Sequence, residues 1–174
     1  MGIQFETDYN METLTAMAKG LRKTVRKKRS RRVHIFAAVV LVFGLLTILA
    51  TVAGGEPLGA SGVVTLLAML VVILVSLFED RLNAWFARKR LLPGTEHAAA
   101  TFEEDGYVSA TGVTESRFSY AQIVAVAETA RYFVFALSSH HTQAYDKRTI
   151  RGGSVEDFRA FIAEKTGKLV ENIK

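Results

Sequence analysis

Two long apolar runs constrain the fold of this chain more than any other feature. Residues 33–53 and 58–78 contain no Asp, Glu, Lys or Arg, and only residues 54–57 separate them. A helix rises about 1.5 Å per residue, so each run is long enough to cross the roughly 30 Å hydrocarbon layer of a membrane. Two buried helices of this length in a soluble protein would need a core larger than the rest of the chain can surround. The sequence therefore predicts a transmembrane hairpin with a short extracytoplasmic loop at 54–57.

Basic residues beside the two runs predict the orientation of the hairpin. Nine Lys or Arg residues lie between positions 19 and 32, and Arg81, Arg88, Lys89 and Arg90 follow the second run, whereas the loop contains only Glu56. Short segments rich in Lys and Arg stay in the cytoplasm. We therefore expect a two-pass protein of the cell inner membrane with both termini in the cytoplasm.

Composition excludes several functional classes. The formal net charge is +5, but residues 95–174 contain nine Lys or Arg against eleven Asp or Glu, a net charge of −2, so we expect no nucleic-acid binding by this part. The chain has no cysteine, which excludes thiol catalysis, zinc sites built from cysteine, and disulfides.

The segment before the first run divides into two parts. Residues 3–9 alternate apolar and polar side chains, so residues 1–10 are predicted to form a strand that joins the sheet of the later domain. Residues 11–32 carry Leu14, Leu21 and Val25 at helical spacing among basic residues, which predicts a basic amphipathic juxtamembrane helix. This helix either continues into the membrane or breaks near Ser30.

The basic face of residues 11–32 has two interpretations. It contacts anionic lipids, or it is only the topology signal that flanks most membrane helices. Residues 79–94 are predicted to form an interfacial helix and linker, and Glu79 and Asp80 are expected to face the cluster Arg29–Arg32. The candidate membrane-surface residues are Arg22, Arg26, Lys27, Arg29, Arg31, Arg32, Trp85 and Arg88.

Residues 95–174 are typical of a small cytoplasmic antiparallel β domain. Six short strand patterns follow one another from residue 97 to residue 145, and Asp105-Gly106 favours a tight hairpin turn between the first two. Ser154 and Asp157 form a capping-box pattern before an apolar stripe that ends near Gly167, which predicts a C-terminal helix. With the N-terminal strand, the order of about seven strands and one helix predicts a pleckstrin-homology-like (PH-like) fold.

Several of these segments also resemble one bacterial family. The segments are 118–123, 132–135, Asp146-Lys147-Arg148 and 154–158, and together with the two spans they resemble the YcxB-like membrane proteins. The resemblance implies a PH-like domain on a membrane anchor and no assigned activity.

Few residues carry recognisable chemistry. Adjacent side chains on a strand point to opposite faces, so His140-His141 is expected to be a polar turn and not a metal site. No catalytic motif and no cofactor motif is present, so we expect a non-enzymatic protein without a cofactor. The candidate anion- or partner-binding loop contains Lys147, Arg148, Arg151, Gly152, Gly153 and Ser154, because free backbone N–H groups at a helix start bind anions. The alternative is a flexible turn before a capped helix.

The function expected from these observations is a membrane-anchored binding or regulatory protein. Its cytoplasmic domain would bind an unknown protein partner or the head group of an anionic membrane lipid. Two alternatives stay open: a component of an oligomeric transporter or channel, and an immunity-type membrane protein that neutralises a toxin. Small residues in the spans, such as Gly44 and Gly62, also favour a homo-oligomer.

Overall fold

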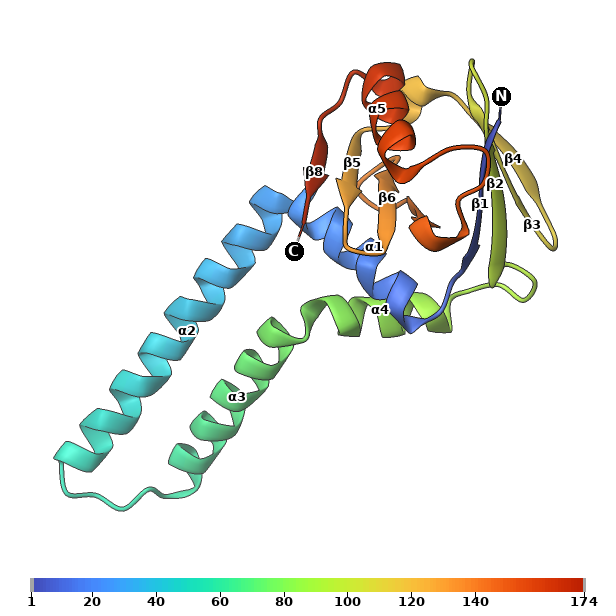
Figure 1. The fold of residues 1–174 in the computed structure, drawn as a ribbon. Helices are drawn as coiled ribbons and strands as arrows, with labels where there is room; N and C mark the ends of the chain where they lie inside the picture. The colour runs from blue at the N-terminus through green and yellow to red at the C-terminus, as the bar shows by residue number, and fades with distance from the viewer. Residues whose placement is uncertain (1, 174) are drawn as a thin grey trace.

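A hairpin of two long helices projects from a β domain (Figure 1). The structure is a computed structural model and describes residues 2–173. Helices α2 (Lys27–Ala53) and α3 (Ala60–Leu77) form the hairpin, and two shorter helices, α1 (Met11–Lys23) and α4 (Glu79–Lys89), connect it to the domain. This is the mixed fold class that the sequence predicts.

The first sheet has the strand order β1-β2-β3-β4, and all of its pairs are antiparallel. Its strands are β1 (Ile3–Asp8), β2 (His97–Phe102), β3 (Tyr107–Thr111) and β4 (Glu115–Phe118). Strand β1 pairs with β2 along its whole length, from Ile3 opposite Phe102 to Asp8 opposite His97. The strand before the helical hairpin therefore lies beside the strand that follows it.

The second sheet has the order β7-β6-β5-β8 and contains one strand that the sequence analysis did not predict. Its strands are β5 (Ala125–Glu128), β6 (Tyr132–Ala136), β7 (Thr142–Asp146) and β8 (Val170–Asn172). The chain does not end with helix α5 (Val155–Thr166), because β8 follows it and pairs parallel with β5. The N–H of Ile173 extends this pairing by donating to the carbonyl of Glu128 at 2.8 Å.

An aromatic core lies between the two sheets and α5. Phe5 from β1 and Phe102 from β2 contact the ring of Phe158 on α5, with ring centroids 4.6 and 4.8 Å apart. Phe133 and Phe135 on β6 join the same cluster, and all five side chains are buried. Burial of large aromatic rings from three layers is the main apolar contribution to the stability of this small domain.

Helix α1 belongs to the β domain as well as to the membrane-proximal region. All five residues of β6 are buried, because the core covers one face and α1 covers the other. Ala16 packs with Tyr132 and Val134 of β6, and a Cβ atom at Gly20 would lie only 2.7 Å from the Cγ1 atom of Val134. The close approach therefore requires glycine at position 20.

The helix predicted over residues 11–32 is interrupted, but not near Ser30. Helix α1 ends at Lys23, and α2 begins at Lys27 after a turn. The Thr24 hydroxyl and N–H both bond the Gly20 carbonyl, which closes the last turn of α1. The basic residues between positions 27 and 32 therefore lie on the first turns of α2.

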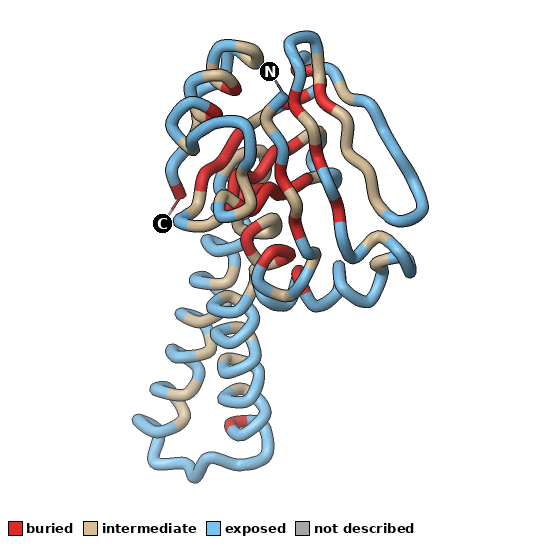
Figure 2. The backbone as a smooth tube through the Cα atoms, turned by 45° about the vertical axis from the view of Figure 1, so that its right-hand side comes forward, coloured by how far each residue is buried: buried red, intermediate tan, exposed pale blue. Residues whose placement is uncertain are grey.

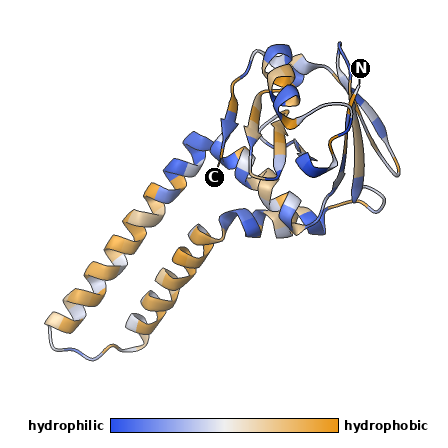
Figure 3. Ribbon diagram, in the orientation of Figure 1, coloured by the Kyte–Doolittle hydropathy of each residue, from blue (hydrophilic) through white to orange (hydrophobic). Residues whose placement is uncertain are grey.

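Helices α2 and α3 are apolar but almost unburied. Figure 3 shows hydrophobic residues along both helices and hydrophilic ones at their base, and Figure 2 shows that nearly the whole hairpin is exposed or half-buried. Both helices are long and apolar enough to cross a membrane, and the most apolar windows of α2 and α3 are only 0% and 6% buried. The apolar core helices of soluble proteins are mostly buried, so this exposure favours a lipid environment.

An ion pair joins α1 to α4 at the base of the hairpin. The Arg22 guanidinium donates two hydrogen bonds to the Asp80 carboxylate, at 2.7 and 2.6 Å. Glu79 lies 3.8 Å from Arg22 and 3.7 Å from the imidazole of His34. The ion pairs of Glu79 and Asp80 thus go to Arg22 and His34 and not to Arg29–Arg32, although Glu79 and Arg29 line the same groove.

Candidate functional site

Lys147 of the predicted anion-binding loop is part of a buried ion-pair cluster. Its ammonium donates to the Glu128 carboxylate at 2.9 Å and to the Thr129 carbonyl at 2.7 Å. Arg159 of α5 also binds Glu128, with bonds of 2.7 and 2.8 Å. The Arg159 guanidinium lowers the pKa of Glu128 most, burial opposes this shift, and Lys147 lowers the pKa further. Lys147 is thus already neutralised.

The other basic residues of this loop are exposed and lie beside carboxylates. Arg148 lies 3.0 Å from Asp146, and Arg151 lies 3.3 Å from Glu6. The backbone of Arg151 pairs with Gln4 of β1, and a Cβ atom at Gly152 would lie 2.6 Å from the Gly2 carbonyl oxygen. Gly153 is exposed and lies beside Ile3. The two glycines therefore allow the loop to pass close to β1.

Ser154 caps α5 as its sequence pattern predicts. The Asp157 N–H donates to the Ser154 hydroxyl at 3.0 Å, and the Ser154 N–H donates to the Asp157 carboxylate at 3.1 Å. A carboxylate of the chain thus occupies the position where a bound phosphate would accept hydrogen bonds. Anion binding by this loop stays a prediction, but its ammonium group and its helix start both have partners.

The predicted membrane-surface residues lie on α1, α2 and α4 and in the turn between α1 and α2, near the base of the hairpin. Arg22 is bound to Asp80, and the Arg26 Nε atom donates to the Ser139 carbonyl at 2.6 Å. Lys27, Arg29, Arg31 and Arg32 are exposed on the first turns of α2. Trp85 and Arg88 are exposed on α4, and the Lys89 ammonium lies 3.6 Å from the centre of the Trp85 ring.

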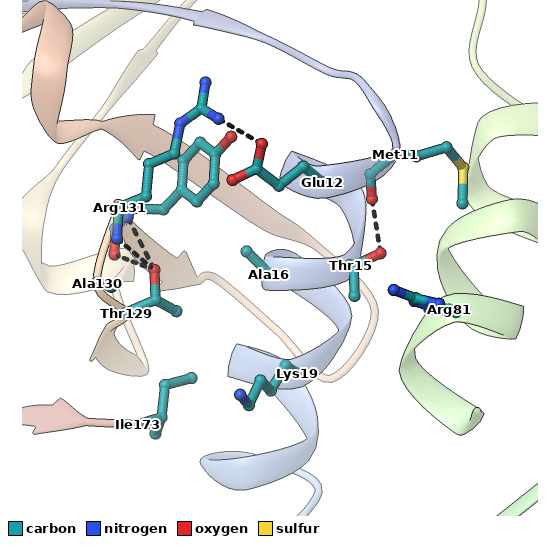
Figure 4. A pocket seen from close by; sticks show the side chains of 11 residues that line it. Met11, Glu12, Thr15, Ala16, Lys19, Arg81, Thr129, Ala130, Arg131 and Ile173 are labelled. Atoms are coloured by element: carbon teal, nitrogen blue, oxygen red, sulfur yellow. Dashed lines mark hydrogen bonds and ion pairs between the residues drawn. The ribbon is translucent and has the colours of Figure 1, made fainter. Parts of the chain in front are cut away.

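A groove that the sequence analysis missed lies between α1, the β5–β6 turn, the C-terminal segment and the start of α4 (Figure 4). Its volume is about 710 Å³. One side of α1 contributes Met11, Thr15 and Ala16, and the opposite wall contains Ala130 and Ile173. The apolar and small side chains give the groove a largely apolar surface, which a peptide segment or an apolar ligand fits.

Charged groups surround this groove. Arg131 bridges the Glu12 carboxylate of α1 and the buried Asp146, to which its guanidinium binds at 2.8 Å. The structure describes no carboxylate within ion-pairing distance of Lys19 on α1 or Arg81 on α4, which both line the groove. Among residues 2–173, the rim therefore has two positive charges, those of Lys19 and Arg81, without a carboxylate partner. No local sequence signal indicates this groove, because the neighbours of Lys19 across it come from residues 81 and 129–132.

The described residues contain no group of three His, Asp or Glu side chains that could hold a metal ion. His140 and His141 lie in the turn between β6 and β7, where their N–H groups donate to the Ser138 hydroxyl at 3.1 and 3.0 Å. The arrangement of the groove supports noncovalent binding of a ligand with apolar and acidic groups.

Comparison with known proteins identifies one part of the chain. Residues 102–162, which run from the end of β2 into α5, match a family model described as YcxB-like protein. This segment, about a third of the chain, is similar to the YcxB-like family. The resemblance noted in the sequence is thereby confirmed, and the YcxB-like segment contains β3 to β7, Glu128 and the candidate loop. No curated protein and no solved structure matched the chain.

Proposed function

We propose that this protein is a non-enzymatic, membrane-anchored binding protein of the bacterial inner membrane, with both termini in the cytoplasm. The observation that carries the proposal is the junction between domain and hairpin. Helix α1 packs on β6, its Arg22 binds Asp80 of α4, and α1 and α4 connect directly to the two exposed apolar helices. A domain fixed in this way presents its surfaces at a constant height above the bilayer.

The basic residues at the base of the hairpin support the proposed orientation. Residues 27–32 lie on the domain side of α2, and Arg88, Lys89 and Arg90 lie on the domain side of α3. Positively charged flanks stay in the cytoplasm, whereas the loop between α2 and α3 carries only Glu56. This charge distribution supports a cytoplasmic position for the β domain.

The strand order of the domain favours a PH-like fold. Seven strands in two sheets precede α5, and α5 contributes Phe158 and Ile162 to the core between those sheets. Strand β8 is an addition to that plan. A PH-like fold hosts many kinds of binding site, so the ligand has to be inferred from the site and not from the fold.

The groove between α1 and the β5–β6 turn is the proposed binding site, and its proposed occupant is a segment of a protein partner with apolar and acidic side chains. The apolar lining from Met11, Ala16 and Ile173 fits the apolar side chains. Lys19 and Arg81 at the rim complement acidic ones, and opposite charges at a rim increase association rate and specificity.

Site-specific photocrosslinking in bacterial cells tests this function. A photoreactive residue replaces Thr15 in the groove of the full-length chain, and a control chain carries it at Glu115, which is exposed on β4. We expect position 15, and not position 115, to crosslink a protein partner. The Lys19→Glu variant should lose this product because it reverses one rim charge.

Lys168→Glu is the matched control, because Lys168 is exposed and lies outside the groove. The product should persist in this variant. Identical products from positions 15 and 115, or an equal effect of Lys19→Glu and Lys168→Glu, would overturn the assignment of the groove.

A further inference from the structure

A second groove lies on a different side of α1, where the β domain meets the two apolar helices. Its volume is about 490 Å³, and α1, the start of α2, α4 and the β6–β7 turn all contribute to its walls. Its lining includes Val33, the first residue of the predicted first span, and Glu79, which directly follows the second. The groove therefore lies at the level where the chain changes from polar to apolar.

Arginine side chains are concentrated in this groove. Arg26, Arg29 and Arg90 line it, and within residues 2–173 no carboxylate lies within ion-pairing distance of any of them. Arg22 and Glu79 are also in the lining, but Arg22 is bound to Asp80, and Glu79 lies near both Arg22 and His34. In the part of the chain that the structure describes, the uncompensated charge of the groove therefore comes from three guanidinium groups, two at the start of α2 and one at the end of α4.

One of these guanidinium groups is held in place by the domain. The Arg26 Nε atom donates to the Ser139 carbonyl at 2.6 Å, which attaches the turn before α2 to the β6–β7 turn. Arg29 lies on the first turns of α2, and Arg90 follows the last turn of α4. A guanidinium offers parallel N–H donors that match the oxygens of a phosphate.

The walls between these arginines are apolar. Leu21 and Met17 of α1 and Phe86 of α4 line the groove together with Val33. A free inorganic phosphate gains nothing from such walls, whereas a phospholipid places its glycerol and first acyl carbons against them. In a bilayer this position lies in the head-group layer, where basic residues attract anionic lipids of the cytoplasmic leaflet.

We propose that this groove binds one anionic phospholipid, with its phosphate held by Arg26, Arg29 and Arg90 and its acyl chains beside α2 and α3. The inference rests on the proposed membrane placement. Such a site differs from a general attraction of anionic lipids to basic residues beside a membrane span. The phosphate contacts are made by the arginines that line the groove and not by Arg31, Arg32 or Arg88.

Lipid retention by matched double variants tests the proposal. The full-length protein is reconstituted in nanodiscs of phosphatidylcholine with a minority of phosphatidylglycerol. Native mass spectrometry then releases the protein from the nanodiscs and counts the lipids that stay bound to it. R29A/R90A removes one charge from α2 and one from the end of α4 inside the groove. R31A/R88A removes one charge from each of the same helices outside it.

We expect R29A/R90A to reduce the retained phosphatidylglycerol about tenfold more than R31A/R88A, since only the first pair removes charge-assisted hydrogen bonds to the phosphate. Added inorganic phosphate should not displace the lipid. Equal losses from the two pairs, or displacement by phosphate, would overturn the lipid site and leave the membrane placement intact. Failure of the wild-type chain to enter nanodiscs would overturn both proposals. Circular dichroism checks that both variants keep the native fold.

Discussion

Glu128 lies at the end of β5 with only 4% of its surface exposed, yet it carries a charge. Lys147 and Arg159 both donate to its two oxygens, so the carboxylate joins β5 to the chain after β7 and to α5. Removal of one partner from such a cluster leaves a buried charge without compensation, which is strongly unfavourable. The cluster is therefore expected to matter for stability.

The substitution Glu128→Gln should lower the free energy of unfolding by about 3 kcal/mol at neutral pH, because Lys147 and Arg159 lose their counter-ion. Arg159 and Lys147 hold the pKa of Glu128 below its usual range. The contribution of Glu128 to the stability of the folded protein is therefore complete above the ordinary glutamate pKa, and it disappears as the pH falls through the lowered pKa of the folded state. The difference between wild type and variant should therefore shrink in acid. Denaturation of the full chain in mild detergent at several pH values measures it.

Glu115→Gln is the control, because Glu115 is exposed on β4. This control should leave stability unchanged at every pH. A Glu128→Gln variant as stable as this control at neutral pH would contradict the expected role of the cluster.

Local patterns were the part of the site that sequence could predict. Ser154 and Asp157 are three residues apart, and their capping box is in the structure as the pattern indicates. The partners of Lys147 were not predictable, because Glu128 precedes it by 19 residues and becomes a partner only through the pairing of β5, β6 and β7. Anion binding by the predicted loop stays a prediction, and its basic side chains have carboxylate partners that the sequence did not indicate.

At the scale of the elements, α1 shows that an amphipathic pattern predicts a helix but not the surface against which its apolar side packs. Its apolar residues, including Leu14 and Leu21, were assigned to a helix near the membrane, and the structure buries both of them within the protein. A stripe of this kind fits a lipid surface or a protein surface equally well. Gly20 was the local sign of a close protein contact, since it lies against Val134.

The Arg22–Asp80 pair should couple α1 and α4 energetically. Both side chains are mostly buried, with 21% and 16% exposed, and the contact has two hydrogen bonds. A double-mutant cycle with Arg22→Ala and Asp80→Ala should give a coupling energy of about 1–2 kcal/mol in thermal unfolding of the full chain. A cycle with Asp80→Ala and Arg88→Ala should be additive, and equal coupling in the two cycles would contradict a specific pair.

At the scale of the whole molecule, the apolar runs and the alternating strands predicted the fold class. Strand β8 was not predicted, because Val170-Glu171-Asn172 is too short and polar to have a strand pattern of its own. It forms because α5 returns the chain to the free edge of β5. Both grooves also depend on residues far apart in the chain, so neither has a local motif.

Cysteine labelling tests the proposed topology of the molecule. The chain has no cysteine, so a single introduced thiol is the only target for a membrane-impermeant maleimide. In spheroplasts we expect Glu56→Cys, in the loop between α2 and α3, to react at once. Lys168→Cys, in the domain, should react only after lysis. Reaction of Lys168→Cys before lysis would refute a cytoplasmic domain.

The pairing of β1 with β2 has a consequence for biosynthesis. The ribosome delivers β1 and α1 first, and their partners β2 and β6 emerge only after both apolar helices have been made. Insertion of a single span would leave β1 and β2 on opposite sides of the bilayer, where no sheet can close between them. In the proposed membrane topology, the first sheet therefore closes only in a chain with both arms of the hairpin inserted, and insertion of one arm alone leaves β1 and β2 unpaired.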